Sequence, residues 1–211
     1  MKRSRSILLI AALAWLAQNS ASADIIFTAN LTHDQETVQG ALTTSTGSPR
    51  PLSFGNASFI LNDAQTALTM TATIFNIDVT GSQTSDTFDN LNAAHIHVGA
   101  PPGTNAPVRW GFFGAPDNDI NPDQLVVTPF VSGVGGTFAT VWDAPEGNAG
   151  TTLTSNLPEI LAGLSYLNFH TVQFGGGEIR GQILRTPDEG STAMLLSLAL
   201  AGILMAVRRR R

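Results

Sequence analysis

The chain has 211 residues, of which 43% are hydrophobic and 13% charged, and its formal net charge is −5. It contains no cysteine, which excludes disulfide bonds, thiolate metal sites and cysteine nucleophiles. Composition changes sharply near both ends. We therefore divide the chain into an N-terminal signal at 1–23, one domain at 24–185 and a C-terminal signal at 186–211.

Residues 1–23 have the layout of a secretory signal peptide. Three basic residues precede an apolar run over 7–17, and Ala21 and Ala23 are the small residues that signal peptidase reads. We expect cleavage before Asp24 and export of the rest of the chain. An uncleaved N-terminal anchor is the alternative, although this apolar run is short for a hydrocarbon layer about 30 Å thick.

Residues 24–185 are predicted to form one all-β domain. Along Leu68–Ile74, apolar residues alternate with threonine, which is typical of an antiparallel strand with one buried face. The predicted strands are 25–31, 37–43, 55–61, 68–74, 93–98, 108–113, 136–142, 167–172 and 178–184, with a hairpin turn at 62–65. Their number and spacing favour an antiparallel β-sandwich or a flattened barrel.

One short helix is expected near 157–162. Asn156 is a suitable N-cap, Pro158 suits the first turn, and Gly163 can end the helix.

The domain is much more acidic than the whole chain. Seven of the 11 basic and two of the 16 acidic residues lie in the terminal segments, so four basic and 14 acidic residues remain and the formal charge is −10. Such a surface repels phosphate backbones, which excludes nucleic acid as a partner. Divalent cations or basic surfaces suit it better.

Three of the four histidines lie in two strand-like segments. His95 and His97 alternate along one strand, so both side chains point to the same face, about 7 Å apart. His170 joins them if its segment lies alongside. Three imidazoles in this arrangement favour zinc or copper. The alternative is a buried polar network, in which the histidines bond to Glu178, Asn168 or backbone carbonyls.

A second candidate cation site lies in the acidic loop at 116–123. Oxygen-bearing residues occupy every second position, as in the first half of an EF-hand loop; they are Asp117, Asp119, Asn121 and Asp123. Pro122 stands where that motif needs glycine, and Thr128 stands where it needs glutamate. Calcium therefore ranks behind zinc or copper, and a solvated turn is the alternative.

Glu178, Arg180 and Gln182 alternate near the end of the domain. We expect Arg180 to bond to a carboxylate or to loop carbonyls and so to hold the sheet edge. The alternative is contact with an anionic ligand. Gly175–Gly177 has no helix after it, so it is interpreted as a hairpin connection or bulge and not as a phosphate loop.

Residues 186–211 have the layout of a sorting signal. A polar stretch precedes an apolar run over 193–207, and four arginines end the chain. As a helix this run reaches only about 22 Å, which is short for a permanent span. The arginines would stay on the cytoplasmic side and halt export.

This layout resembles the bacterial PEP-CTERM sorting signals, in the variant that begins Val-Pro-Asp-Ser-Gly. Pro187, Asp188 and Gly190 match that motif, whereas Thr186 and Glu189 differ. The resemblance implies recognition by an exosortase-like membrane protease and removal of the tail. The domain would then reach the cell surface or the medium through a membrane-anchored intermediate, with transient membrane association through 193–207. A permanent C-terminal anchor is the alternative.

The domain itself resembles the CHRD domain, a module first described in chordin and found in many exported bacterial proteins. The resemblance covers roughly 27–184 and rests on Ala94–Gly99, on Tyr166–Thr171 and on Gly177–Ile183. It implies a β-rich extracellular domain, and it does not imply a settled biochemical activity.

Two functions remain open. The first is an exported module of the bacterial envelope or extracellular matrix, which binds a surface or matrix ligand or has a structural role. The second is a metal-dependent exported enzyme that uses the three histidines. The chain has no Gly-x-Ser-x-Gly and no His-Glu-x-x-His motif. We therefore expect a module and not an enzyme.

Overall fold

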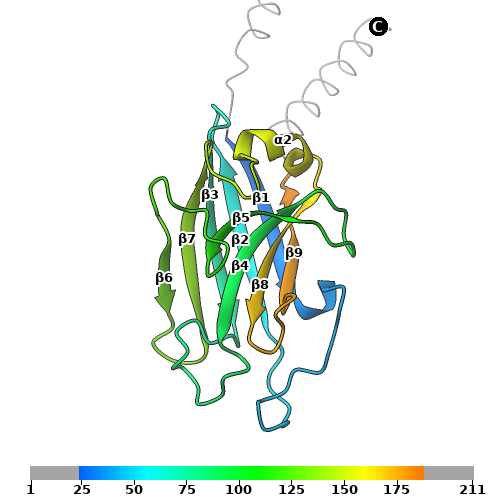
Figure 1. The fold of residues 1–211 in the computed structure, drawn as a ribbon, viewed down its shortest axis with the longest axis vertical. Helices are drawn as coiled ribbons and strands as arrows, with labels where there is room; N and C mark the ends of the chain where they lie inside the picture. The colour runs from blue at the N-terminus through cyan, green and yellow to red at the C-terminus, as the bar shows by residue number, and fades with distance from the viewer. Residues whose placement is uncertain (1–23, 188–211) are drawn as a thin grey trace, which may run out of the picture.

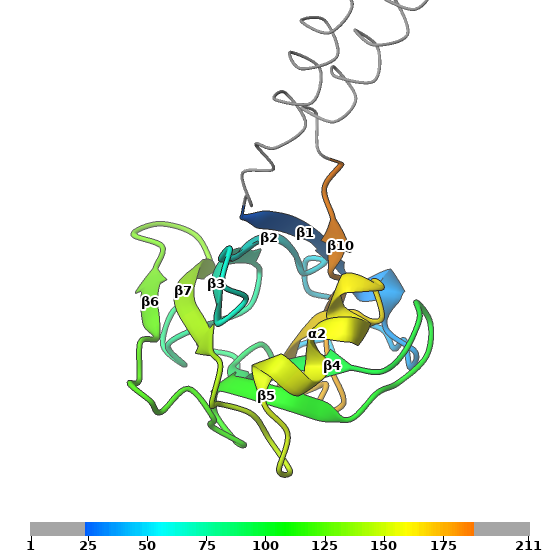
Figure 2. The same ribbon diagram turned by 90° about the horizontal axis from the view of Figure 1, so that it is seen from above.

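In the computed structural model, which describes residues 24–187, ten strands form one antiparallel sheet in the order β5-β4-β8-β9-β1-β2-β3-β7-β6, with β10 paired to β1 (Figure 1). The strands are β1 (Ile25–Thr32), β2 (Phe54–Leu61), β3 (Ala67–Phe75), β4 (Leu91–Val98), β5 (Val108–Phe113), β6 (Val126–Pro129), β7 (Gly135–Asp143), β8 (Ser165–Thr171), β9 (Ile179–Gln182) and β10 (Leu184–Arg185). The sheet curls into a half-barrel (Figure 2). The predicted all-β, antiparallel fold class is confirmed.

The β2–β3 hairpin shows how local sequence sets strand register. Leu61 lies opposite Leu68, and the predicted turn at 62–65 joins the two strands. The Asn62 side-chain carbonyl accepts hydrogen bonds from the backbone N–H groups of Thr66 and Ala67. Both strands bury every second side chain. The alternation therefore directs the apolar side chains of both strands to the inside of the curl.

Aromatic packing joins β5 and β7, which lie near opposite ends of the strand order. Trp110 on β5 stacks on Trp142 of β7 with ring centroids 5.5 Å apart and an interplanar angle of 5°. Phe138 on β7 packs edge-on against Phe112 of β5 and Phe169 of β8. These rings fill the inside of the curl, so side-chain packing closes the half-barrel where strand pairing does not.

Glu146 also joins β5 to β7, through hydrogen bonds to the two tryptophans. Its carboxylate accepts from the indole N–H of Trp110 and from the backbone N–H groups of Ile120 and Asn121, and its backbone carbonyl accepts from the indole of Trp142. The Glu146 side chain is buried, yet these donors satisfy it.

One strand prediction was wrong, and one strand was not predicted. The segment 37–43 is a loop after the short 3-10 helix η1 (His33–Gln35), apart from a single bridge between Thr43 and Pro49. The Gln173 side chain bonds to the backbone of Ala41 and Thr43, where a strand partner was expected. The sequence interpretation also missed β6, an exposed four-residue edge strand that ends in proline.

The helix exists, but its predicted start was wrong. Helix α2 spans Leu153–Leu161 and is capped by Thr152, whose hydroxyl accepts from the backbone N–H of Ser155. Thr152 and Ser155 form a capping box one turn before the expected cap. Asn156 instead donates to the Thr152 carbonyl, and Pro158 lies in the second turn.

The sheet brings the two ends of the domain together. Phe27 lies opposite Arg185, and the Thr186 backbone N–H donates to the Ile26 carbonyl at 2.9 Å. The predicted signal peptide at 1–23 and the sorting signal from 188 onward, including Asp188, Gly190 and the apolar run, lie outside the described residues. Within 24–187, no helix is long and apolar enough to cross a membrane.

Replacing Phe138 with alanine should lower the free energy of unfolding by about 3–5 kcal/mol, because it opens a cavity in the aromatic cluster. Chemical denaturation of the purified protein measures this change. Val131→Ala, at a fully exposed position, is the matched control and should change stability by less than about 0.5 kcal/mol. Equal effects of the two substitutions would contradict the assignment of Phe138 to the core.

Candidate metal centre

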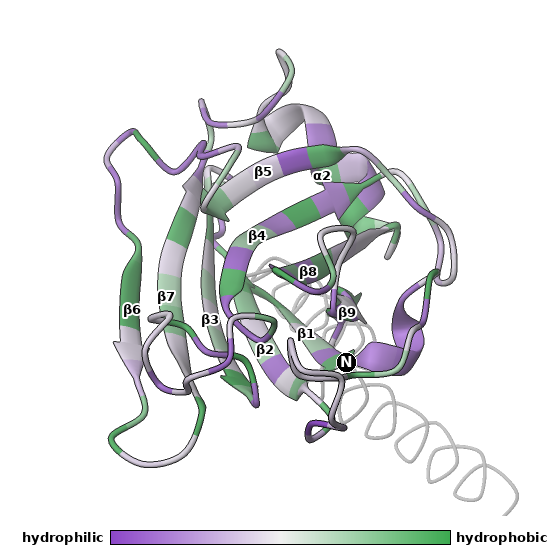
Figure 3. Ribbon diagram, turned by 60° about the horizontal axis from the view of Figure 1, so that its bottom comes forward, coloured by the Kyte–Doolittle hydropathy of each residue, from purple (hydrophilic) through white to green (hydrophobic). Residues whose placement is uncertain are grey.

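Strands β4, β8 and β9 are buried on both faces over most of their length, unlike β1, β2 and β3, which bury every second side chain. Their inner face contributes apolar side chains such as Ile96, Phe169 and Ile179 to the core. Their outer face carries polar side chains, and Figure 3 shows hydrophilic and hydrophobic residues alternating along β4. Loops cover this outer face, so its polar groups must find partners away from water.

Three histidines on this outer face converge. The structure places His170 on β8 opposite Ala93 of β4, next to the pair formed by His95 and Asn168. His95 Nδ1 and His170 Nε2 are 3.1 Å apart, and one nitrogen from each of the three rings lies within 4.8 Å of the others. The exposed fractions of His95, His97 and His170 are 5%, 8% and 7%.

Backbone carbonyls determine which nitrogen of each ring carries hydrogen. His95 Nε2 lies 3.1 Å from Ala115 O, His97 Nδ1 lies 2.8 Å from Ala106 O, and His170 Nδ1 lies 3.0 Å from Gly175 O. A carbonyl only accepts hydrogen bonds, so each of these nitrogens must donate. In the neutral rings, the other nitrogens carry lone pairs; those of His95 and His170 face each other, and that of His97 has no hydrogen-bond partner among the described residues.

This arrangement matches the requirements of a metal ion. The lone pairs of His95 Nδ1 and His170 Nε2 repel each other at 3.1 Å unless a proton or a cation lies between them. Metal-ligating histidines commonly donate their second N–H to a carbonyl, as all three rings do here. Zn–N bonds of 2.0–2.1 Å place tetrahedral ligands roughly 3.3 Å apart, within the range spanned by this trio.

The pKa values favour metal ligation over protonation. Burial lowers the pKa of His95 to about 4, and the neighbouring His170 contributes to the shift. Burial also lowers the pKa of His97 to about 4 and lowers the pKa of His170. At neutral pH the rings of the metal-free protein are therefore uncharged and can bind a cation without first losing protons.

Arg180 organises the loops beside the histidines. Its guanidinium lies 3.8 Å from the ring centroid of Tyr166, which stacks on His97 at 4.6 Å. The guanidinium pairs with Glu36 at 3.2 Å and donates to Thr104 O and Asn105 Oδ1. These contacts are the expected carboxylate and loop carbonyl, but the predicted sheet edge was wrong, because β9 lies between β8 and β1.

Glu178 and Gln182 serve other loops. Glu178 forms an ion pair with Arg50 and accepts hydrogen bonds from Ser53 and Thr171. Within residues 24–187, the ion-pair partner of Arg180 is Glu36 and not Glu178. Gln182 donates to the carbonyls of Ala100 and Gly163. Sequence reasoning missed Arg50 and Glu36, because neither lies in a recognisable motif and both are distant in sequence from their partners.

The fourth histidine stands apart from the trio. His33 Nδ1 lies 2.7 Å from Glu178 O, and its Nε2 lies 3.0 Å from Gly40 O. Both ring nitrogens are therefore engaged with the loops that precede β2 and β9.

The acidic loop does not bring its carboxylates together. Asp119 is buried and accepts from the Thr140 hydroxyl and from the backbone N–H of Gln124, whereas Asp117 and Asp123 are exposed and accept from nearby backbone N–H groups. Among the described residues, at least three His, Asp or Glu side chains bring their ligand atoms together at the histidine trio and not in this loop. The observed contacts of the loop are those of a turn.

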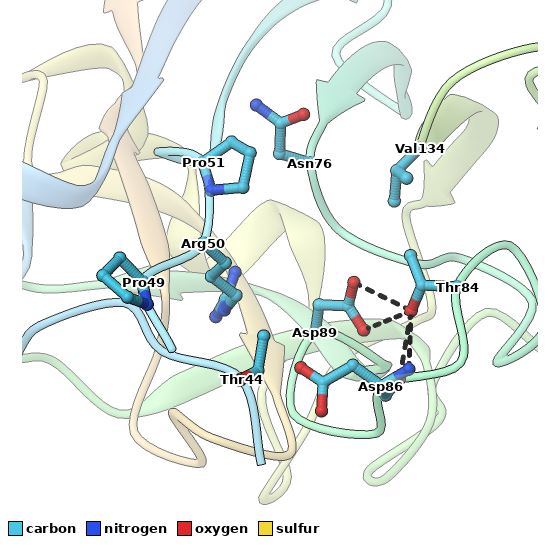
Figure 4. Close-up of a pocket in the computed structure, with 9 residues that line it drawn as sticks. All are labelled: Thr44, Pro49, Arg50, Pro51, Asn76, Thr84, Asp86, Asp89 and Val134. Carbon is cyan, nitrogen blue, oxygen red and sulfur yellow. Dashed lines mark hydrogen bonds between the residues drawn. The ribbon is translucent and has the colours of Figure 1, made fainter. Parts of the chain in front are cut away.

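A surface pocket of about 230 Å³, lined by Arg50 among others, lies between the loops at 44–51 and 78–90 (Figure 4). The Thr84 hydroxyl donates to the Asp89 carboxylate, and Asp86 accepts from the backbone N–H of Ser45. Burial raises the pKa of Asp89. Asp86 thus joins the loops at 44–51 and 78–90, whereas the Asp89 contact lies within the second loop.

The model of the family described as the CHRD domain matches residues 27–183, well over half of the chain. No curated protein and no solved structure matches the chain.

Metal-free protein should lose stability as pH falls from about 6.5 to 4. In this window the unfolded chain binds protons at His95 and His97, whereas the folded chain holds these two rings neutral, so protonation favours unfolding. Carboxyl groups with raised pKa, such as Glu36, act in the opposite direction. The difference between wild type and His97→Asn, which keeps a donor for Ala106 O, isolates the histidine contribution.

Chemical denaturation in the presence of a chelator, repeated across this pH range, measures the effect. The expected result is a shallower loss of stability on acidification in His97→Asn. Parallel pH profiles for the two proteins would show that His97 is not held neutral by burial.

Proposed function

The chain belongs to the CHRD-domain family, and on that premise we propose that it is an exported module of the bacterial envelope or extracellular matrix whose domain binds one zinc or copper ion. CHRD domains are typical of extracellular or secreted proteins. The metal ligands in this proposal are His95, His97 and His170.

The convergence of three imidazole lone pairs carries the metal proposal. Each ring is oriented by a different loop carbonyl, and together the rings join β4 to β8. A metal ion at this point would tie two strands and three loops to one another. The domain has no cysteine, so this metal cross-link would stabilise the fold as disulfide bonds do in many exported proteins.

The low exposure of the trio favours a binding or structural centre over a catalytic one. Three histidines fill only three of the four tetrahedral positions, and the loops that cover the trio, whose rings are at most 8% exposed, limit access of a substrate to the fourth. The alternative function, a metal-dependent exported enzyme, is favoured by one observation only. Polar atoms that lack partners in the described part of the chain lie beside the histidines and are compatible with an additional ligand.

The sorting proposal rests on the two terminal segments. We assign 1–23 to signal peptidase and 186–211 to an exosortase-like protease, with the domain retained at the surface or released. Support comes from the sheet, because the Thr186 hydrogen bond to Ile26 ends the folded domain immediately before the motif at Pro187, Asp188 and Gly190. The acidic surface favours a cationic or basic partner in the matrix.

The purified exported protein should bind one Zn²⁺ or Cu²⁺ per chain, and His95→Gln combined with His97→Asn should weaken binding at least about a hundredfold. Both replacements keep a hydrogen-bond donor for the loop carbonyl while removing a nitrogen ligand. Calorimetric titration and elemental analysis measure affinity and stoichiometry. His33→Gln is the matched control and should leave binding unchanged.

An absence of stoichiometric metal in the wild type would overturn the metal proposal. Equal affinity in the double variant would assign the metal to other residues.

Truncation after Pro187 should release the exported domain into the medium, because it removes the apolar run and the arginines but keeps the Thr186 hydrogen bonds. Asp188→Ala with Gly190→Ala should instead leave an uncut precursor in the membrane fraction. Cell fractionation with mass measurement of the product distinguishes these forms. A soluble cytosolic product that retains residues 1–23 would refute export.

A further inference from the structure

A set of buried polar atoms without partners surrounds the histidine trio. Within residues 24–187 these atoms are His97 Nε2, both amide atoms of Asn168, Glu36 Oε1 and Arg180 Nε. Asn168 is 1% exposed, and among the residues described neither its oxygen nor its nitrogen has a hydrogen-bond partner. A buried amide without hydrogen bonds lowers the free energy of unfolding, so native structures usually supply a ligand or an ordered water as its partner.

Strand register places Asn168 next to the proposed metal. It lies directly opposite His95 on β4 and opposite Arg180 on β9, and it precedes His170 by two residues on the same face of β8. Directly opposed side chains in antiparallel strands have Cβ atoms about 4.5–5.5 Å apart. The Asn168 side chain therefore leaves the sheet beside that of His95, on the face that carries the three imidazoles.

Glycine at 177 leaves room on the other side of this amide. A Cβ at that position would lie 2.4 Å from Glu36 Oε1 and 2.5 Å from both Asn168 amide atoms, and the backbone there has φ +124°. The Glu36 carboxylate and the Asn168 amide thus approach each other across the bare backbone of Gly177. Glu36 Oε2 is held by Arg180, which leaves Oε1 facing this space.

We propose that a water molecule occupies the fourth position of the metal, held by Asn168 with Glu36 behind it, and that small anions can replace this water. The inference rests on the proposed metal centre. Three histidines leave one tetrahedral position open. A water bound through its oxygen donates two hydrogen bonds, and Asn168 Oδ1 and Glu36 Oε1 are the acceptors available for them.

The same residues suit a small anion. Asn168 Nδ2 and Arg180 Nε are donors that no other group uses in the described part of the chain. An anion on the metal would accept from these donors in place of the water. Glu36 and Gly177 also line a surface pocket of about 310 Å³, with the neighbouring residues Gly175 and Gly176. This pocket thus adjoins the Glu36 carboxylate on which the proposed water depends.

The test uses the exported protein loaded with Co²⁺, whose visible absorption reports coordination number and ligand exchange, and azide as the anionic probe. In the wild type, azide should change the Co²⁺ spectrum in a saturable manner. Asn168→Leu should bind Co²⁺ within about threefold of wild type, because the three histidines remain, but should bind azide at least about tenfold more weakly. Asn90→Ala, which removes a buried amide oxygen elsewhere, is the matched control and should behave as wild type.

The outcomes separate this inference from the metal proposal. If Co²⁺ binds but azide leaves the wild-type spectrum unchanged, the metal centre stands and the exchangeable fourth position is refuted. If azide binds Asn168→Leu as tightly as wild type, the role of Asn168 is refuted. If Co²⁺ and Zn²⁺ both fail to bind, the metal centre itself fails. Asn168→Asp provides a second variant of the same shape in case the leucine variant does not fold, and its charge should also weaken azide binding.

Discussion

The candidate centre depends on the hydrogen bonds that three buried imidazoles donate to three loop carbonyls. The strands alone would bring the rings together without determining which nitrogens face one another. Ala106, Ala115 and Gly175 supply acceptors from three separate loops, and each acceptor turns a lone pair toward the centre. The site therefore exists only when the covering loops are in place, and binding a cation would stabilise those loops in turn.

Two buried ion pairs hold these covering loops. Arg180 connects β9 to Glu36 after η1 and to the loop at 104–105, and Arg50 connects the loop before β2 to Glu178. Buried ion pairs add little net stability when their desolvation is counted, but they tolerate few alternative arrangements. Their role here is to select one arrangement of long loops over the outer face of β4, β8 and β9.

The residues that carry the family resemblance lie on this doubly buried part of the sheet. His95, His97, His170, Arg180 and Gln182 all belong to β4, β8 or β9, and Glu178 immediately precedes β9. The remaining strands need only a buried inner face, which many apolar sequences provide. The outer face of β4, β8 and β9 allows fewer sequences, because each buried polar group there requires a specific partner.

Part of this molecule could be predicted from short-range pattern alone. The alternation of apolar and polar residues identified most strands, the β2–β3 turn and the shared face of His95 and His97, because side-chain direction in a strand depends only on local backbone geometry. The loop at 37–43 was misassigned because its partner is the side chain of Gln173 and not another strand. The helix start was misplaced because both Thr152 and Asn156 are suitable N-cap residues, and Thr152 is the one that forms a capping box with Ser155.

The composition of the site was decided by the tertiary structure. From the sequence, His170 lies near His95 only if the two strands are adjacent. The pairing of β8 with β4 makes them adjacent and brings His95 Nδ1 and His170 Nε2, which are 75 residues apart in the chain, to 3.1 Å. The partners Glu36 and Arg50, the unsatisfied Asn168 and the orienting carbonyls carry no local signal. They come together through contacts between segments far apart in the chain, and the energy of such contacts depends on three-dimensional arrangement, which a local sequence pattern does not encode.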